Sequence, residues 1–199
     1  MNYKEVYEQW LNNEFFDEET KADLLSTKDD EAEIEDRFYK GLEFGTAGLR
    51  GKLGAGTNRM NKYMVGKAAQ ALAETLKDHG EEAVKRGVAI SYDVRYKSKE
   101  FAELTCSIMA AHGIKTYIYN GIHPTPMCSY AIRKLHCKAG VMVTASHNPQ
   151  EYNGYKAYWE EGSQILDDIA GQIAGHMDEI VNFEDIKSIP FEEALESGL

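Results

Sequence analysis

Cysteine is scarce in this sequence, and the few cysteines present form no recognisable pattern. The chain has three, an odd number with no C-x-x-C spacing, at Cys106, Cys128 and Cys137. The sequence therefore offers no disulfide framework around which a fold would be organised. The first five residues also lack the apolar stretch of a secretory signal. Together these absences predict reduced thiols in a cytoplasmic protein.

Long apolar runs and positive charge are also in short supply. No apolar run approaches the roughly 20 residues that would span a bilayer. The formal net charge is -11, which argues against nucleic acid or an anionic membrane surface as a partner, because both attract clustered Lys and Arg. One stretch, residues 42–62, reverses this balance. Its charged residues are Arg50, Lys52, Arg59, Lys62 and the single acid Glu43. We expect an anionic substrate to be attracted there.

The order of apolar segments after residue 87 indicates the fold class. Strands are predicted at 88–92, 114–119 and 139–143, with helices at 98–112 and 126–136 between them. Right-handed crossovers should place helices on both faces of such a sheet. We therefore predict an α/β fold, a three-layer α/β/α domain with a mixed, largely parallel sheet and a helical N-terminal arm.

The chain is long enough, at 199 residues and 43% hydrophobic content, to bury one substantial core. We predict a helical arm at 1–41, the α/β domain at 42–187, and a linker or the start of a further domain at 188–199. Helix caps are assigned to small polar residues that begin each helical pattern. These are Asp17, Asp30, Asn61, Ser98, and Asp167 or Asp168. A returning strand is predicted at 155–159, and a second short one at 164–166.

Five glycines lie between Leu42 and Asn61. They let main-chain N–H groups approach an anion closely, but their spacing fits neither a Walker loop nor a G-x-G-x-x-G turn. Taken alone, the cluster favours an ordinary glycine-rich hairpin. Arg50 makes phosphate a better candidate ligand, because its planar guanidinium suits phosphate oxygens.

The most informative stretch is Thr144-Ala145-Ser146-His147-Asn148-Pro149, which directly follows the strand predicted at 139–143. Ser146 therefore lies in a tight polar loop at the carboxyl end of a buried strand, where α/β domains place their chemistry. The restricted Asn and Pro backbone would hold its hydroxyl outward. Ser146 is a candidate nucleophile.

This loop, with Asn153-Gly154-Tyr155-Lys156 after it, resembles the phosphoserine loop of the α-D-phosphohexomutases. Upstream, Phe44-Gly45-Thr46-Ala47-Gly48-Leu49-Arg50-Gly51 is similar to the first substrate-facing loop of the same superfamily. The sequence of that loop, continued through Asn61, is more similar to the phosphoglucomutase and phosphopentomutase branch than to the bacterial phosphomannomutase branch. The resemblance covers nearly the whole chain, but only about the first third of such an enzyme.

The resemblance implies a phosphosugar mutase, an intramolecular phosphotransferase of carbohydrate metabolism. Phosphorylated Ser146 would donate to a phosphorylated monosaccharide, pass through a sugar bisphosphate, and be rephosphorylated. Lys156 matches the acid/base lysine, with a pKa that neighbouring cations would lower. His147 would assist catalysis, and the phosphate-binding residues would be Arg50, Asn148 and Thr144.

The resemblance also implies Mg²⁺, which would neutralise the moving phosphoryl group. The Asp-Gly-Asp metal loop of the superfamily is missing from this sequence, so an oxygen of phosphorylated Ser146 would be the only ligand that this chain supplies. Mg²⁺ is not held tightly by one such ligand. We expect the downstream domains of the same polypeptide to complete the site, and the fragment alone to be inactive.

Two other functions stay open. A serine hydrolase would also use a serine and a histidine, but G-x-S-x-G is absent and His147 is badly placed as a base because it adjoins Ser146. A non-catalytic phosphosugar-binding module would explain the missing metal loop. Asp93 and Arg95 could touch substrate or a neighbouring domain, although a local ion pair is the simpler expectation. His123 is predicted to be structural.

Overall fold

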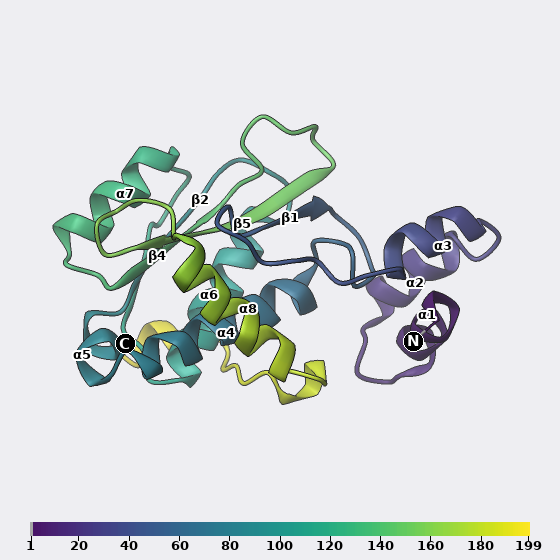
Figure 1. Cartoon of the computed structure of the whole chain (residues 1–199), viewed down its shortest axis with the longest axis horizontal. Helices are drawn as coiled ribbons and strands as arrows, with labels where there is room; N and C mark the ends of the chain where they lie inside the picture. The colour runs from purple at the N-terminus through teal and green to yellow at the C-terminus, as the bar shows by residue number, and fades with distance from the viewer. Residues whose placement is uncertain (1) are drawn as a thin grey trace.

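A helical arm stands beside a body built on a sheet (Figure 1). The structure, a computed structural model, describes residues 2–199. The arm contains α1 (Tyr3–Asn12), α2 (Glu18–Ser26) and α3 (Glu31–Phe38). Its helices begin where side-chain oxygens of Asn2, Asp17 and Asp30 accept hydrogen bonds from backbone N–H groups of the first turn. The two predicted aspartate caps are thus confirmed.

Aromatic side chains hold the arm together and attach it to the body. Trp10 stacks on Phe16, with ring centroids 4.2 Å apart, and meets Tyr63 edge-on at 5.5 Å. Tyr63 belongs to α4 (Lys62–Asp78) of the body. Two ion pairs, Asp17 with Lys62 and Glu19 with Lys97, reinforce this junction. The arm is therefore packed onto the body rather than trailing from it.

The sheet has the strand order β1-β5-β4-β2-β3. Its strands are β1 (Leu49–Lys52), β2 (Val88–Tyr92), β3 (Thr116–Ile118), β4 (Ala139–Val143) and β5 (Tyr152–Trp159). The pairs β2–β3 and β2–β4 are parallel, whereas β5 is antiparallel to both β4 and β1. β5 alone therefore runs opposite to the other strands, which confirms a mixed, largely parallel sheet.

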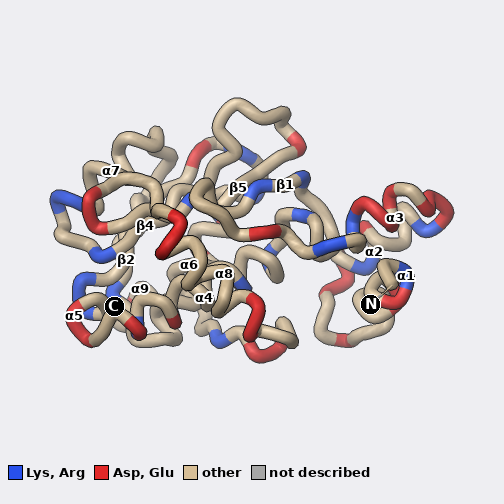
Figure 2. Tube along the Cα trace, in the orientation of Figure 1, with Lys and Arg blue, Asp and Glu red and all other residues tan. Residues whose placement is uncertain are grey.

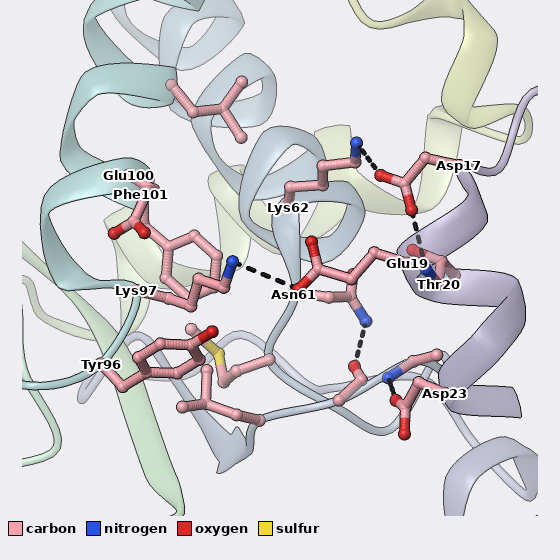
Figure 3. A pocket seen from close by; sticks show the side chains of 15 residues that line it. Asp17, Glu19, Thr20, Asp23, Asn61, Lys62, Tyr96, Lys97, Glu100 and Phe101 are labelled. Carbon is pink, nitrogen blue, oxygen red and sulfur yellow. Dashed lines mark hydrogen bonds and ion pairs between the residues drawn. The ribbon is translucent and has the colours of Figure 1, made fainter. Parts of the chain in front are cut away.

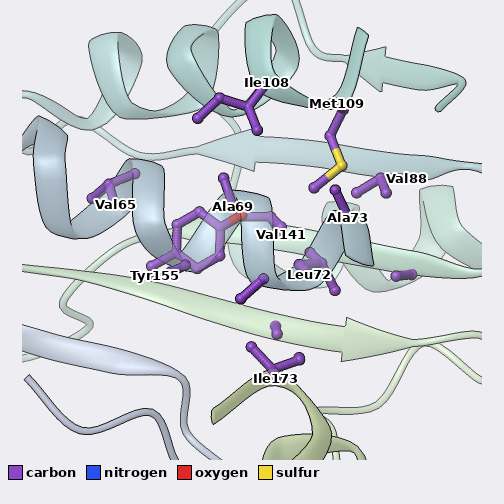
Figure 4. Close-up of a cluster of buried hydrophobic side chains, with 14 of the residues drawn as sticks. Val65, Ala69, Leu72, Ala73, Val88, Ile108, Met109, Val141, Tyr155 and Ile173 are labelled. Atoms are coloured by element: carbon purple, nitrogen blue, oxygen red, sulfur yellow. The ribbon is translucent and has the colours of Figure 1, made fainter. Parts of the chain in front are cut away.

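Helices cover both faces of the sheet (Figure 1). On one face lie α4, α6 (Ser98–Ala111) and α8 (Asp167–Glu179), and on the other lies α7 (Thr125–Lys134). Figure 4 shows the larger core, where Leu72, Val141 and Tyr155 meet between α4 and the sheet. A smaller cluster, which includes Cys128 and Met142, lies under α7. This is the predicted three-layer α/β/α arrangement.

The remaining elements are short. α5 (Glu81–Arg86) links α4 to β2, and a 3-10 turn η1 (Phe183–Asp185) precedes α9 (Phe191–Glu196). α9 contacts α6, with Ala194 buried. The boundaries at residues 41 and 187 stay predictions.

Several local expectations were wrong. Ser98 does not cap α6; the N-cap is Lys97, in the left-handed region at φ 65°, and the Ser98 hydroxyl donates to Asp93 instead. α8 begins at Asp167 after Leu166, without a side-chain cap. The Ser98 hydroxyl is engaged by Asp93, five residues earlier in the preceding turn, so it is not available to cap the helix. Residues 164–166 make a single bridge, from Gln164 to Tyr158.

β5 also begins earlier than the predicted range of 155–159. Its first residues pair with β1, Arg50 lying opposite Gly154 and Lys52 opposite Tyr152. The glycine cluster at 42–61 favoured a glycine-rich hairpin, with no pairing to the later strand. The edge strand β1 therefore determines the length of β5.

Candidate active site

Two loops meet at the carboxyl edge of the sheet. The loop from Thr144 to Glu151 follows β4, and the turn from Asp93 to Lys97 follows β2. β2 and β4 are parallel neighbours in register, so both segments leave the sheet at the same edge. The structure thus brings Ser146 next to the turn that carries Asp93 and Arg95.

Ser146 is exposed at this edge and has an unusual backbone conformation. Its φ is 57°, in the left-handed region, which costs a non-glycine residue about 1–2 kcal/mol. Its N–H donates to the Thr144 hydroxyl oxygen at 2.9 Å. The Thr144 hydroxyl in turn donates to Asp93 at 2.5 Å. A non-glycine residue that its neighbours hold in the left-handed region is typical of functional sites.

Arg95 holds the loop from behind. Its terminal nitrogens donate to four backbone carbonyls, at distances from 2.6 to 3.0 Å. These carbonyls belong to Ser146, Asn148, Pro149 and Tyr152. The sequence analysis preferred a local ion pair with Asp93, and that contact is present but long, at 3.8 Å. The main role of Arg95 was missed because carbonyl partners leave no charge pattern in a sequence.

Arg50 reaches the loop from β1, where its guanidinium donates to the Asn148 side-chain oxygen at 2.9 Å. Arg50 and Lys52 alternate with buried Leu49 and Gly51, so both face outward. The pairing of β1 with β5 puts them on the face that also carries Lys156. The structure therefore unites Arg50, Asn148 and Ser146, as the sequence analysis expected.

Lys156 lies in β5 opposite Met142 of β4. Burial lowers the pKa of its ammonium, and the positive charge of Arg50 lowers it further, while Asp93 acts in the opposite direction. A lowered pKa increases the neutral amine fraction at neutral pH. The side chain is thus suited to exchanging a proton.

The two histidines near this edge differ. His147 is exposed in the loop beside Ser146. His123 stacks on Tyr119, with ring centroids 4.1 Å apart, and its Nδ1 lies 2.8 Å from the Gly121 carbonyl oxygen. These contacts give His123 the structural position that was predicted.

Two glycines allow this edge to close. A Cβ on Gly154 would lie 2.6 Å from the Thr144 carbonyl oxygen, and one on Gly48 would lie 1.9 Å from that of Tyr155. Gly48 also has φ +75°. Both positions therefore exclude a side chain, for steric reasons at Gly154 and for steric and conformational reasons at Gly48.

The positive stretch at 42–62 is divided by the fold, as the charges in Figure 2 show. Arg59 is buried against Glu33 and Asp36, and Lys62 pairs with Asp17. The expectation that these two cations attract an anion was wrong, because the carboxylates of the arm neutralise them. Within residues 2–199, Arg50 and Lys52 have no carboxylate within ion-pair distance.

The cavity drawn in Figure 3 does not include Ser146 in its lining. It has a volume of about 510 Å³ and lies between α2 of the arm and the first turns of α4 and α6 (Figure 3). Met60, Phe101 and Leu104 supply apolar lining, and Tyr96 and Lys97 form part of its wall. It borders the Asp93–Lys97 turn through Tyr96 and Lys97, but no residue of the loop from Thr144 to Glu151 lines it.

A divalent cation is not accommodated by this chain's own side chains. Within residues 2–199 there is no group of three or more His, Cys, Asp or Glu residues that could hold a metal. Asp93, whose carboxylate contacts Thr144 of the loop, already accepts hydrogen bonds from Arg95, Ser98 and Thr144. In the described part of the chain, no helix is long and apolar enough to cross a membrane.

Comparison with known proteins identifies the family of the chain. Residues 41–183 match the family model described as phosphoglucomutase/phosphomannomutase, alpha/beta/alpha domain I. A phosphoglucomutase of Staphylococcus epidermidis is 38% identical over 179 residues, which is 90% of this chain and 30% of that protein. The Schizosaccharomyces pombe protein named "Probable phosphoribomutase" is 40% identical over 165 residues, 82% of this chain and 28% of that protein.

A solved structure agrees. A crystal structure of a Thermus thermophilus protein has 30% sequence identity and a TM-score of 0.63, covering 69% of this chain and 30% of that one. The chain thus spans less than a third of the length of the relatives it matches. It belongs to the phosphoglucomutase/phosphomannomutase family, and residues 41–183 correspond to the family's α/β/α domain I.

Proposed function

We propose that this chain is the phosphoserine-bearing domain of a phosphosugar mutase, with Ser146 as the phosphate carrier. The observation that carries the proposal is the exposed, left-handed Ser146, held at the end of β4 by Thr144 and Arg95. The Staphylococcus relative is named a phosphoglucomutase and the Schizosaccharomyces relative a phosphoribomutase. The reaction class is therefore transfer of a phosphoryl group between two hydroxyls of one sugar.

The roles of the surrounding side chains follow from their chemistry. Arg50 would bind a phosphate oxygen through the guanidinium edge that now faces Asn148. Lys156 would exchange a proton with the sugar hydroxyl, and its lowered pKa favours this. His147 and Asn148 would donate hydrogen bonds to the phosphate, and Thr144 would fix the loop.

The substrate would be a phosphorylated hexose or pentose, and the intermediate a sugar bisphosphate. Phospho-Ser146 would give its phosphoryl group to the free hydroxyl of the sugar monophosphate. The other phosphate of the resulting bisphosphate would then return to the Ser146 oxygen. Any Mg²⁺ would require ligands beyond the side chains described here, because they offer no cluster of their own.

Phosphorylation at Ser146 is the most direct test. The full-length protein that carries this chain is incubated with glucose 1,6-bisphosphate, and its intact mass and phosphopeptides are determined. We expect one added phosphate, mapped to Ser146 and absent in Ser146→Ala. An unmodified chain together with undiminished mutase activity of Ser146→Ala at full length would contradict the proposal.

Two alternatives give different results in the same experiment. A serine hydrolase would label at Ser146 with a fluorophosphonate and would hydrolyse an ester. A non-catalytic module would bind the sugar phosphate without acquiring a phosphate. We further expect the 199-residue chain alone to show no mutase turnover in a coupled glucose 1-phosphate assay.

A further inference from the structure

The turn that follows β2 has a fixed shape. The Asp93 carboxylate accepts hydrogen bonds from the Arg95 N–H at 3.0 Å, the Ser98 hydroxyl at 3.0 Å and the Thr144 hydroxyl at 2.5 Å. It therefore connects the start of α6, the turn and the residue after β4. Asn153 adds a second connection, since its side-chain nitrogen donates to the Tyr96 carbonyl at 2.9 Å. The position of the Arg95 backbone is set by these contacts.

The Arg95 side chain is committed to the protein. A guanidinium has five N–H groups. The two terminal nitrogens of Arg95 make four hydrogen bonds to loop carbonyls, and Nε lies 3.8 Å from an Asp93 oxygen. The side chain is only 13% exposed. No terminal N–H remains for a phosphate, so Arg95 acts on the loop and not on the substrate.

The carbonyls that Arg95 binds span residues 146–152, the whole segment that carries the phosphate. One of them belongs to Ser146 itself, with Arg95 Nη2 at 3.0 Å from its oxygen. A backbone carbonyl that loses its donor must find another partner. Without the guanidinium, the loop would therefore relax toward conformations in which Ser146 leaves the left-handed region.

We propose that Arg95 is a positioning residue that holds Ser146 in its phosphoryl-transfer orientation, and that Asp93 orients both Arg95 and Thr144. This inference rests on the proposed mutase function. Because Arg95 does not reach the substrate, its loss slows the chemical step and leaves substrate binding nearly unchanged.

The kinetic test uses the full-length protein that carries this chain. In Arg95→Met we expect kcat to fall about 100-fold and KM to change by less than about threefold, because misplacing a reacting group by about 1 Å has an effect of this size. Arg95→Lys keeps the charge but loses the planar fork, and we expect an intermediate loss of about tenfold. Arg133→Met, on the exposed side of α7, is the matched control and should leave kcat unchanged.

Chemical rescue separates positioning from folding. Arg95→Ala leaves a space with the shape of the lost guanidinium, so added guanidinium ion should restore part of kcat, and it should not affect Arg133→Met. Restoration of activity by the free ion requires a folded protein. An Arg95→Ala variant that melts normally and keeps the wild-type kcat without added guanidinium overturns the inference.

Hydrogen exchange gives a readout that does not depend on activity. In the 199-residue chain, Arg95→Met should accelerate exchange at the amides of residues 146–152 while those of α8 keep their protection. Faster exchange in α8 as well would signal global loss of structure, and the guanidinium rescue of Arg95→Ala would then decide. If wild-type Ser146 accepts no phosphate, the proposed function fails, yet loop exchange still tests positioning. Unchanged exchange in the loop of Arg95→Met, or a change in KM without a change in kcat, refutes the positioning role of Arg95.

Discussion

The arm junction and the carboxyl edge both contain arginines, but these arginines bind different kinds of partner. In the arm junction, Arg37 and Arg59 are buried against Asp23, Glu33 and Asp36. At the carboxyl edge, Arg95 donates mainly to neutral carbonyls, with an Asp93 oxygen at 3.8 Å, and Arg50 donates to a neutral amide oxygen. The arm neutralises its positive charge, whereas the edge retains it. We therefore expect an anion to be attracted to the edge, although the chain as a whole is acidic.

The lysines follow the same division. Burial lowers the pKa of Lys62, but its contact with Asp17 outweighs burial and the net pKa is raised. Lys156 is also partly buried, yet its strongest charged neighbour is Arg50, and its pKa is lowered. The oppositely charged Asp17 thus raises the pKa of Lys62, whereas the like-charged Arg50 helps to lower the pKa of Lys156. Substitutions of single residues in the arm and at the carboxyl edge would test this comparison.

The largest effect is expected in the arm. Arg37→Met removes the main partner of Asp23 and one of the two arginines that pair with Glu33, and we expect a loss of about 2–3 kcal/mol in unfolding free energy, because these carboxylates are about one-third exposed. Arg50→Met should stay within about 0.5 kcal/mol. Urea unfolding of both variants measures the difference. Equal losses would show that the two regions do not differ in this way.

Gly154→Ala should damage the edge through backbone sterics. Its Cβ would lie 2.6 Å from the Thr144 carbonyl oxygen and 3.0 Å from that of Leu49, so we expect a loss of about 1–3 kcal/mol. Gly171→Ala is the matched control: it lies in α8 with open space around it, and it should gain about 0.5–1 kcal/mol. Thermal melting of both variants checks the signs, and a neutral Gly154→Ala would contradict the tight closure of β5 on the loop.

Arg50→Met should weaken recognition of phosphate without unfolding the chain. We expect KM for the sugar phosphate to rise about tenfold in the full-length protein, since a charge-assisted hydrogen bond contributes about 1.5–3 kcal/mol. Lys52→Met should have a smaller effect because an ammonium lacks the bidentate fork. Steady-state kinetics on the two variants distinguishes them, and an unchanged KM in Arg50→Met would exclude Arg50 from substrate binding.

The smallest effect concerns the pKa of Lys156. A lowered pKa leaves more neutral amine at a given pH, so Lys156 should react with acetic anhydride at a lower pH than Lys62, whose pKa is raised. Arg50→Gln removes the neighbouring cation, raises the pKa of Lys156 and shifts its reaction to higher pH. Peptide mass spectrometry across a pH series follows both lysines. Identical profiles in the wild type would mean that burial and charge do not act on Lys156 as described.

Much of the fold could be predicted because local rules and tertiary packing agree. Asp17, Asp30 and Asn61 cap their helices as expected, and the buried strands 88–92 and 139–143 coincide with β2 and β4. The failures lie where a contact from a distant segment decides the outcome. β1 was missed because its pairing with β5 joins residues about a hundred positions apart.

The sequence by itself determined that Ser146 follows a buried strand in a restricted polar loop, because apolar periodicity and turn residues act over a few neighbours. Only the tertiary structure decided which cations remain available to an anion, since carboxylates of the arm reach Arg59 and Lys62 but leave Arg50. It also decided that Arg95 supports the loop. Four carbonyls drawn from a folded loop make that contact, and backbone carbonyls are present at every position of a sequence.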